Sequence, residues 1–189
     1  MPAARESLLE AAGAALATRP WPAVRMVEVA ATAGVSRQTL YNEFGGKEGL
    51  GHALVRREAD WYLDGVDRAL GHPAASAERL AAVAEWTVRA ARAHPLVRAL
   101  LTGCWDAALP APGPTRGPGS GPPGPGALAR AVSERAAAAL APDEGAQRCE
   151  LAVRLALSYV IAPAEGPAQP ALAELLRLLS APIRTAAAR

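Results

Sequence analysis

The sequence predicts an all-α protein, and three observations favour this fold class. Apolar residues make up 51% of the 189 residues, which is enough for a packed core. Alanine and leucine dominate that fraction, whereas the β-branched and aromatic residues that favour strands are sparse. Apolar positions recur three and four residues apart through most of the chain, as they do on one face of a helix.

Local signals place the helices in order. Proline closes the first helix at Pro20 and suits the first turn of a later one at Pro95. Gly34, which is free to take positive φ, ends the second helix; Ser36 is an N-cap for the third and Gly46 a weaker cap for the fourth. Helices are expected at residues 7–18, 26–33, 37–43, from 47 past 63, 77–93, 95–102, 127–140, 146–161 and 170–187.

A proline- and glycine-rich segment interrupts this pattern. Residues 110–126, "PAPGPTRGPGSGPPGPG", contain seven prolines and six glycines, and neither helix nor strand tolerates that composition. We expect a disordered loop that serves as a plain linker. A proline-rich ligand for a partner is the alternative, which the many glycines weaken.

The spacing of four residues predicts a helix-turn-helix. Ala30 is small enough to let two helices approach closely, and Gly34 forms the turn between them. Leu40 and Phe44, four residues apart, would pin the second helix against the first. A helical hairpin without a ligand is the alternative for such a spacing alone.

The opposite face of the helix at 37–43 carries side chains of the types that can contact DNA. Arginine can contact guanine through two hydrogen bonds, glutamine or asparagine can do so with adenine, and the threonine methyl can meet that of thymine. A tyrosine and the only lysine of the chain suit phosphate oxygens, beside the positive end of the fourth helix. The predicted base-facing residues are Arg37, Gln38, Thr39 and Asn42, and the predicted phosphate contacts are Tyr41 and Lys47.

The run "VEVAATAGVSRQTLYNEFGGKEGL" resembles the DNA-binding segment of TetR-family transcriptional regulators, and the similarity extends over residues 6–59. The resemblance implies a DNA-binding domain at 2–62, with the helix-turn-helix at about 25–44, and a helical effector-binding and dimerisation domain at 63–189. Arg25 stands where many relatives have a capping threonine, so the capping hydroxyl is lost here, although Glu28 can reach back to the Arg25 amide and Arg25 can itself contact a phosphate. Arg25 and Ser36 complete the predicted DNA-binding set.

The resemblance further implies a homodimer that binds a palindromic operator and is released by a small molecule. The apolar stripe of the last helix is wider than one intramolecular face requires, which favours a second copy as partner. The predicted dimer-interface residues are Leu151, Leu155, Tyr159, Leu172, Leu175, Leu176 and Leu179. An apolar effector pocket is expected at Trp61, Trp86, Leu101 and Trp105, with Arg89, His94 and Asp106 as nearby polar groups.

Charge bears on how such a protein would bind DNA. Between Met1 and Tyr62 seven basic residues balance seven acidic ones, so the net charge of this part is zero. We therefore expect few ionic phosphate contacts and a shallow salt dependence of DNA binding. The basic residues are Arg5, Arg19, Arg25, Arg37, Lys47, Arg56 and Arg57; the acidic ones are Glu6, Glu10, Glu28, Glu43, Glu48, Glu58 and Asp60.

The remaining signals argue against other classes. The three histidines are scattered, and no nucleophile, metal or phosphate-binding motif accompanies them, so an enzyme, a metal and a cofactor are not expected. Both cysteines, Cys104 and Cys149, are expected to fill core space. No apolar segment follows the N-terminal charges, which favours a cytoplasmic protein. The resemblance implies a bacterial protein that is associated with the nucleoid when it is bound to DNA. The competing hypothesis is a helical dimeric module that binds a ligand or protein but not DNA.

Overall fold

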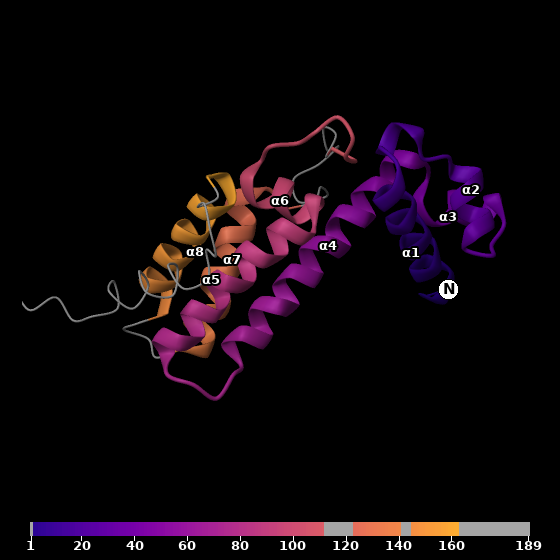
Figure 1. Cartoon of the computed structure of the whole chain (residues 1–189). Coiled ribbons are helices and arrows are strands. Elements are labelled where there is room, and N and C mark those ends of the chain that lie inside the picture. Colours follow the sequence, from indigo (N-terminus) through magenta and orange to yellow (C-terminus); the bar gives the residue numbers. More distant parts are fainter. Residues whose placement is uncertain (1, 112–122, 141–144, 163–189) are drawn as a thin grey trace, which may run out of the picture. The chain divides into compact units, whose positions relative to one another are not determined.

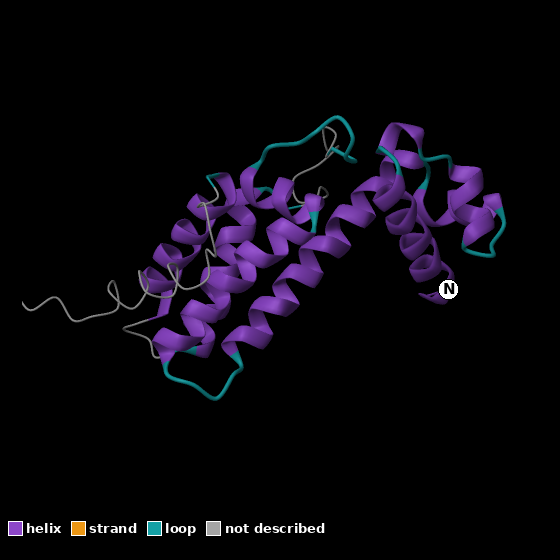
Figure 2. Ribbon diagram, viewed as in Figure 1, coloured by secondary structure: helices purple, strands orange, loops and turns teal. Residues whose placement is uncertain are grey.

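The computed structural model describes residues 2–111, 123–140 and 145–162, and in these ranges all regular structure is helical (Figures 1 and 2). The predicted all-α class is confirmed. The elements are α1 (Pro2–Thr18), the 3₁₀ turn η1 (Trp21–Ala23), α2 (Met26–Thr32), α3 (Arg37–Phe44), α4 (Lys47–Leu70), α5 (Ser76–Ala93), α6 (Pro95–Thr102), α7 (Pro125–Ala139) and α8 (Gly145–Ile161).

The chain divides into two compact units, which are described separately. The first unit, called the head below, combines Met1–Trp61 with His94–Leu128, and the second combines Tyr62–Ala93 with the residues from Ala129 onward. One division falls within α4, and the head takes α6 and the segment that follows α6 from a distant part of the chain. The head is therefore not one continuous stretch of sequence.

The helices α1, α2 and α3 pack on one another in the head, as Figure 1 shows. Leu8 and Leu40 are completely buried, and Val29 and Ala30 of α2 are buried with them. Gly34 has φ 69°, the left-handed conformation that a helix ending in a tight turn requires. The predicted helix-turn-helix therefore forms where its small and apolar residues place it.

A close approach joins α3 to α4. Gly45 ends α3 in the left-handed conformation with φ 70°, and its amide donates to the carbonyl of Tyr41. The first turn of α4 then comes so near that a Cβ on Gly49 would overlap the carbonyl oxygen of Phe44. Only glycine fits at this position, a requirement that the apolar pattern of the sequence does not show.

A hydrogen-bonded polar pair lies in the core of the second unit. The Tyr62 hydroxyl lies 2.9 Å from Thr87 Oγ1, and the Thr87 hydroxyl donates to the Val83 carbonyl at 2.8 Å, so the Tyr62 hydroxyl donates to Thr87. Burial raises the pKa of Tyr62 to about 12, although the bond to Thr87 acts in the opposite direction. This pair satisfies the polar groups of two completely buried side chains.

The two cysteines differ, and the prediction for one of them is wrong. Cys149 is buried in α8, where burial raises the pKa of its thiol to about 11, so it fills core space as an inert thiol. Cys104 is exposed instead. The reason is its position directly after Gly103, which ends α6 in the left-handed conformation and turns the chain away from the helix.

Several boundaries differ from those predicted. The helix α1 begins at Pro2 rather than residue 7, and α7 begins at Pro125, inside the segment expected to be a loop. Proline suits a first helical turn because its fixed φ is helical and its missing amide hydrogen is not needed there. The interior of the expected loop and the helix expected at 170–187 lie outside the described residues. In the described ranges, no helix is both long and apolar enough to span a bilayer.

Candidate nucleic-acid interface

The start of α3 is fixed by Ser36, as predicted. The Ser36 hydroxyl oxygen accepts a hydrogen bond from the Thr39 amide at 3.0 Å, which satisfies a backbone donor that the helix itself leaves free. The same oxygen lies 2.9 Å from Thr39 Oγ1. Both hydroxyls therefore stabilise the first turn of α3. To contact DNA, they would have to replace their mutual hydrogen bond with one to the DNA.

The two faces of α3 differ sharply in exposure. Leu40 is completely buried and Phe44 is 9% exposed, so one face is anchored in the head. Arg37, Gln38, Tyr41 and Asn42 are exposed, and Tyr41 shows 42% of its surface. These four predicted DNA-contacting residues thus share the solvent side of a helix whose opposite side is immobilised by packing, whereas Thr39 is half-buried.

Two of these residues already contact each other. Gln38 Nε2 donates to Asn42 Oδ1 at 2.8 Å, one helical turn further along α3. This bond orients both side-chain amides. It does not use the Gln38 oxygen, which is an acceptor, or the Asn42 nitrogen, which is a donor. A paired amide ladder of this kind can present one donor and one acceptor to a base edge, as adenine requires.

Lys47 is held by the 3₁₀ turn that follows α1. Its ammonium donates to the Pro22 carbonyl at 2.9 Å and lies 5.5 Å from the centre of the Trp21 ring. An ammonium has three donors, so the contact with Pro22 orients the group and leaves donors for a phosphate. Lys47 thus sits in a defined position at the first residue of α4, where the helix dipole adds positive potential.

Arg25 occupies the N-cap position of α2 in an extended conformation, and its side chain makes no capping hydrogen bond. It is exposed, as a phosphate-contacting residue must be. The carboxylate of Glu28, considered a capping group from the sequence, forms an ion pair with Arg19 at 2.7 Å. Glu28 therefore links the first turn of α2 to Arg19, the residue that directly follows α1.

Sequence reasoning missed three residues that shape this face. Arg5 of α1 stacks over the Phe44 ring at 4.6 Å and donates to the Glu43 carbonyl at 3.5 Å, at the carbonyl end of α3. Val27 of α2 is 47% exposed, an unusual placement for a valine in the head. Gly49 permits the α3–α4 approach. Helical periodicity does not reveal any of the three, because the contacts and exposure of each residue depend on other helices of the head.

The four residues predicted for an effector pocket lie in different surroundings. Trp61 stacks on the His94 ring with centroids 4.1 Å apart, and His94 Nδ1 lies 3.1 Å from Glu58 Oε2, all within the head. Leu101 is buried in α6, and Trp105 is partly exposed after it. Trp86 belongs to the second unit, where its Nε1 donates to the Tyr62 carbonyl at 3.0 Å.

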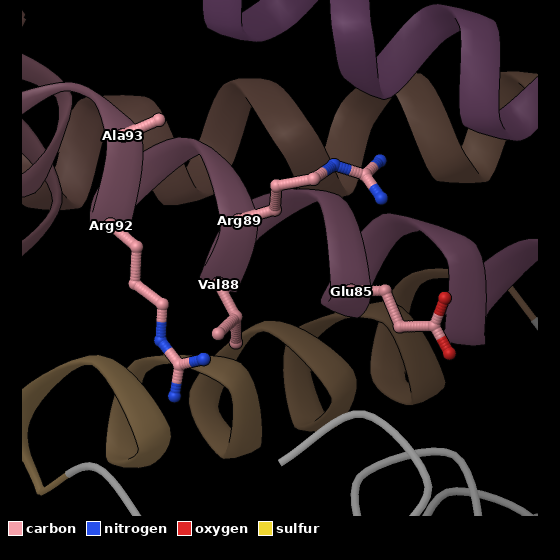
Figure 3. Close-up of a pocket in the computed structure, with 5 residues that line it drawn as sticks. All are labelled: Glu85, Val88, Arg89, Arg92 and Ala93. Carbon is pink, nitrogen blue, oxygen red and sulfur yellow. The ribbon is translucent and has the colours of Figure 1, made fainter. Parts of the chain in front are cut away.

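A cavity of about 330 Å³ lies along α5 in the second unit (Figure 3). Figure 3 shows the side chains of Arg89, Arg92 and Glu85 extending from this helix around it. None of the four predicted effector residues lines the cavity, so their role remains a prediction. Its lining residues are Glu85, Val88, Arg89, Arg92 and Ala93.

The dimer-interface residues that the structure describes lie on α8. Leu151 is 44% exposed, whereas Leu155 and Tyr159 are intermediate, and the three follow one another at four-residue spacing. Ile161 at the end of the helix is 67% exposed. The other predicted interface residues, Leu172, Leu175, Leu176 and Leu179, lie outside the described part of the chain.

The head defines the class of the protein: a helix-turn-helix protein whose second helix is capped, anchored and polar on its free face. Residues 8–54 match the sequence profile of the bacterial regulatory proteins of the tetR family. A segment of 66 residues is 46% identical to the HTH-type transcriptional regulator AlkX of Mycobacterium tuberculosis, covering 35% of this chain and 31% of that relative. The chain thus matches about a third of the length of that curated relative.

Solved structures extend the similarity in fold beyond the head. The TetR family repressor AlkX from a Dietzia strain, implicated in biodegradation of n-alkanes, has 22% identity and a TM-score of 0.54, with coverage of 93% of this chain and 92% of that one. A tetR-family transcriptional regulator from Streptomyces coelicolor has 22% identity and a TM-score of 0.57, with coverage of 93% and 78%.

Residues 8–54 thus carry a DNA-binding segment of the TetR-family type, as the resemblance in the sequence implies. The matched profile and the curated relative are both described as transcriptional regulators, in line with the expectation that this chain is not an enzyme. The neighbours also share the predicted order of a helix-turn-helix followed by a helical C-terminal part.

Proposed function

We propose that this protein is a DNA-binding transcriptional repressor that binds a palindromic operator as a homodimer. The observation that carries the proposal is the construction of α3. Ser36 caps it, Leu40 and Phe44 bury one face, and the opposite face presents exposed arginine and amide groups. A rigid helix with one free polar face is what insertion into a major groove requires.

The geometry of α3 and its surroundings supports the following assignments within the proposed interface. Gln38 and Asn42, joined by their hydrogen bond, contact base edges with Arg37. Tyr41 and Lys47 contact phosphates, and so position the head without reading sequence. Thr39 also faces the groove, where its methyl group can meet that of a thymine. Arg25 and Ser36 complete the set at the N-cap positions of α2 and α3.

The proposal is tested by selection of full-length protein on random duplex DNA. We expect an enriched palindrome with half-sites one helical turn apart, since two symmetric heads must meet successive major grooves. On that site, Tyr41→Ala and Lys47→Ala should each weaken binding across all sequences, by about 1 kcal/mol or more. Gln38→Ala should instead change the preferred base at one position of each half-site.

A control variant distinguishes the loss of a direct DNA contact from the loss of one positive charge anywhere on the protein. Arg130→Ala on α7 removes one exposed positive charge outside the predicted interface and should leave affinity unchanged. If selection enriches no sequence and the wild-type protein binds no duplex, the competing hypothesis of a helical module without DNA binding replaces this one. If Tyr41→Ala, Lys47→Ala and Gln38→Ala bind DNA with the same affinity and preference as Arg130→Ala, the interface is assigned to the wrong face.

The second copy is proposed to contact the free face of α8. Exposed Leu151 at the start of the four-residue repeat supports this placement, because an isolated protomer leaves apolar surface in water there. Leu151→Glu should convert the dimer to a monomer in analytical ultracentrifugation, since a carboxylate would be desolvated at the interface. Arg154→Glu, on the same helix but at an exposed ion pair, is the control. A monomeric wild-type protein would contradict the proposal.

The partner that releases DNA is proposed to be a small hydrophobic or amphipathic molecule, and the protein is proposed to act in the bacterial cytoplasm, at the nucleoid when bound. Support for an apolar effector comes from the aromatic residues Trp61, Trp86 and Trp105, and from the shared fold with an AlkX implicated in n-alkane biodegradation. A ligand can lower DNA affinity only by its differential affinity for the two conformations of the dimer.

A further inference from the structure

One segment of the head lies outside the residues that match the family profile. Residues 103–111, called the strap below, follow α6 and contact the DNA-binding part far away in sequence. The matched profile ends at residue 54. The strap therefore raises the question of what a distant segment contributes to the interface.

The strap makes a backbone bond to the 3₁₀ turn. The Trp21 amide donates to the Ala108 carbonyl at 2.7 Å. Pro110, which is buried, packs beside it: a Cβ added to Gly51 of α4 would lie 3.0 Å from Pro110 Cβ and 3.2 Å from Trp21 Cζ2. Trp21 itself is only 8% exposed. The strap and α4 thus hold Trp21 between them.

Asp106 gives the strap the shape that makes this bond possible. Its carboxylate accepts from the Ala108 amide at 2.7 Å, and its own carbonyl accepts from the Leu109 amide at 3.0 Å. A side-chain oxygen that binds the amide two residues on forms a tight turn and fixes the peptide that follows. The Ala108 carbonyl is thereby directed at the Trp21 amide.

Trp21 in turn positions Lys47. The lysine ammonium lies over the Trp21 ring at 5.5 Å and donates to the carbonyl of the next residue, Pro22, at 2.9 Å. A shift of the 3₁₀ turn would therefore move both groups that fix the ammonium. Lys47 is the residue assigned above to a phosphate, and a phosphate contact depends on where the charge is held.

We propose that Asp106 is a positioning residue for DNA binding, which acts through the strap and Trp21 on Lys47. This inference rests on the proposed function, since it concerns how well the head grips DNA. The expected effect of removing Asp106 on DNA affinity has the opposite sign to the effect expected from net charge. Removing an acidic residue should strengthen binding to DNA by simple electrostatics, whereas loss of this turn weakens it.

The test uses the full-length protein and its selected duplex. Asp106→Ala should weaken binding about three- to tenfold, while Asp106→Asn should bind like the wild type because its amide oxygen still accepts from Ala108. In a Lys47→Ala background, Asp106→Ala should cause no further loss, since the residue through which it acts is gone. The slope of log affinity against log salt should also fall in Asp106→Ala, by no more than the roughly 0.9 expected for one phosphate.

A readout without DNA keeps the inference separate from the proposed function. Trp21 lies between Pro20 and Pro22, which have no amide hydrogens, so its exchange can be resolved in a short peptide. Its amide should be protected in the wild type and in Asp106→Asn, and should exchange faster in Asp106→Ala. Unchanged exchange overturns the link from Asp106 to Trp21, whether or not the protein binds DNA.

The DNA measurements have equally definite contrary outcomes. Equal losses in the wild-type and Lys47→Ala backgrounds would show that Asp106 does not act through Lys47. Equal losses for Asp106→Ala and Asp106→Asn would show that the hydrogen bond accepted from the Ala108 amide does not cause the effect, and would overturn the proposal. Failure of the wild-type protein to bind any duplex would instead reject the proposed function, and the exchange result would still decide the structural link.

Discussion

Gly49→Ala is expected to destabilise the head by roughly 3 kcal/mol, near the upper end for an overpacked site. The added methyl group would overlap the carbonyl oxygen of Phe44, which belongs to the backbone and cannot rotate away. Relief requires the end of α3 to separate from the first turn of α4. The Phe44 anchor is part of that end, so DNA affinity should fall together with stability.

The measurement is urea unfolding of the full chain followed by circular dichroism, with DNA affinity determined in parallel. Gly46→Ser is the matched control, because a Cβ at Gly46 meets nothing within 4 Å and serine is a good N-cap. Gly45→Ala separates strain from collision: its φ is 70° but its surroundings are open, so about 1 kcal/mol is expected. A Gly49→Ala protein as stable as Gly46→Ser would contradict the close approach of α3 and α4.

Gly65→Ala is expected to have the second large effect, about 2–3 kcal/mol, this time in the second unit. The new Cβ would overlap the indole of Trp86. That ring is held by its hydrogen bond to the Tyr62 carbonyl and lies 5.8 Å from the guanidinium of Arg68 and 5.5 Å from that of Arg89. Moving the ring would give up the hydrogen bond and both cation–π contacts.

The sign of this effect should reverse when the indole is absent. In a Trp86→Ala background, Gly65→Ala has no ring to displace and gains the better helix propensity of alanine, up to about 1 kcal/mol. Urea unfolding of the four proteins in this cycle gives the coupling between the two positions. A loss of the same size in both backgrounds would mean that Trp86 is not the group that Gly65 accommodates.

The sequence by itself determined the elements of the proposed interface. The cap between Ser36 and Thr39 joins residues three apart, and Leu40 and Phe44 are one helical turn apart, so local periodicity suffices to place them. The positive φ of Gly34 follows from the same local reasoning. These features need no knowledge of the rest of the chain, because their partners are set by helix geometry.

Only the tertiary structure decided how these elements are held. Lys47 is oriented by Pro22, 25 residues earlier, and Trp21 is held by Ala108. The requirements for glycine at positions 49 and 65 come from a carbonyl and an indole on other helices. Cys104 is exposed because the chain turns at Gly103, and Asp106 accepts a hydrogen bond from the Ala108 amide within the strap. Such contacts depend on which distant segments fold together, and residue spacing along the chain does not encode that.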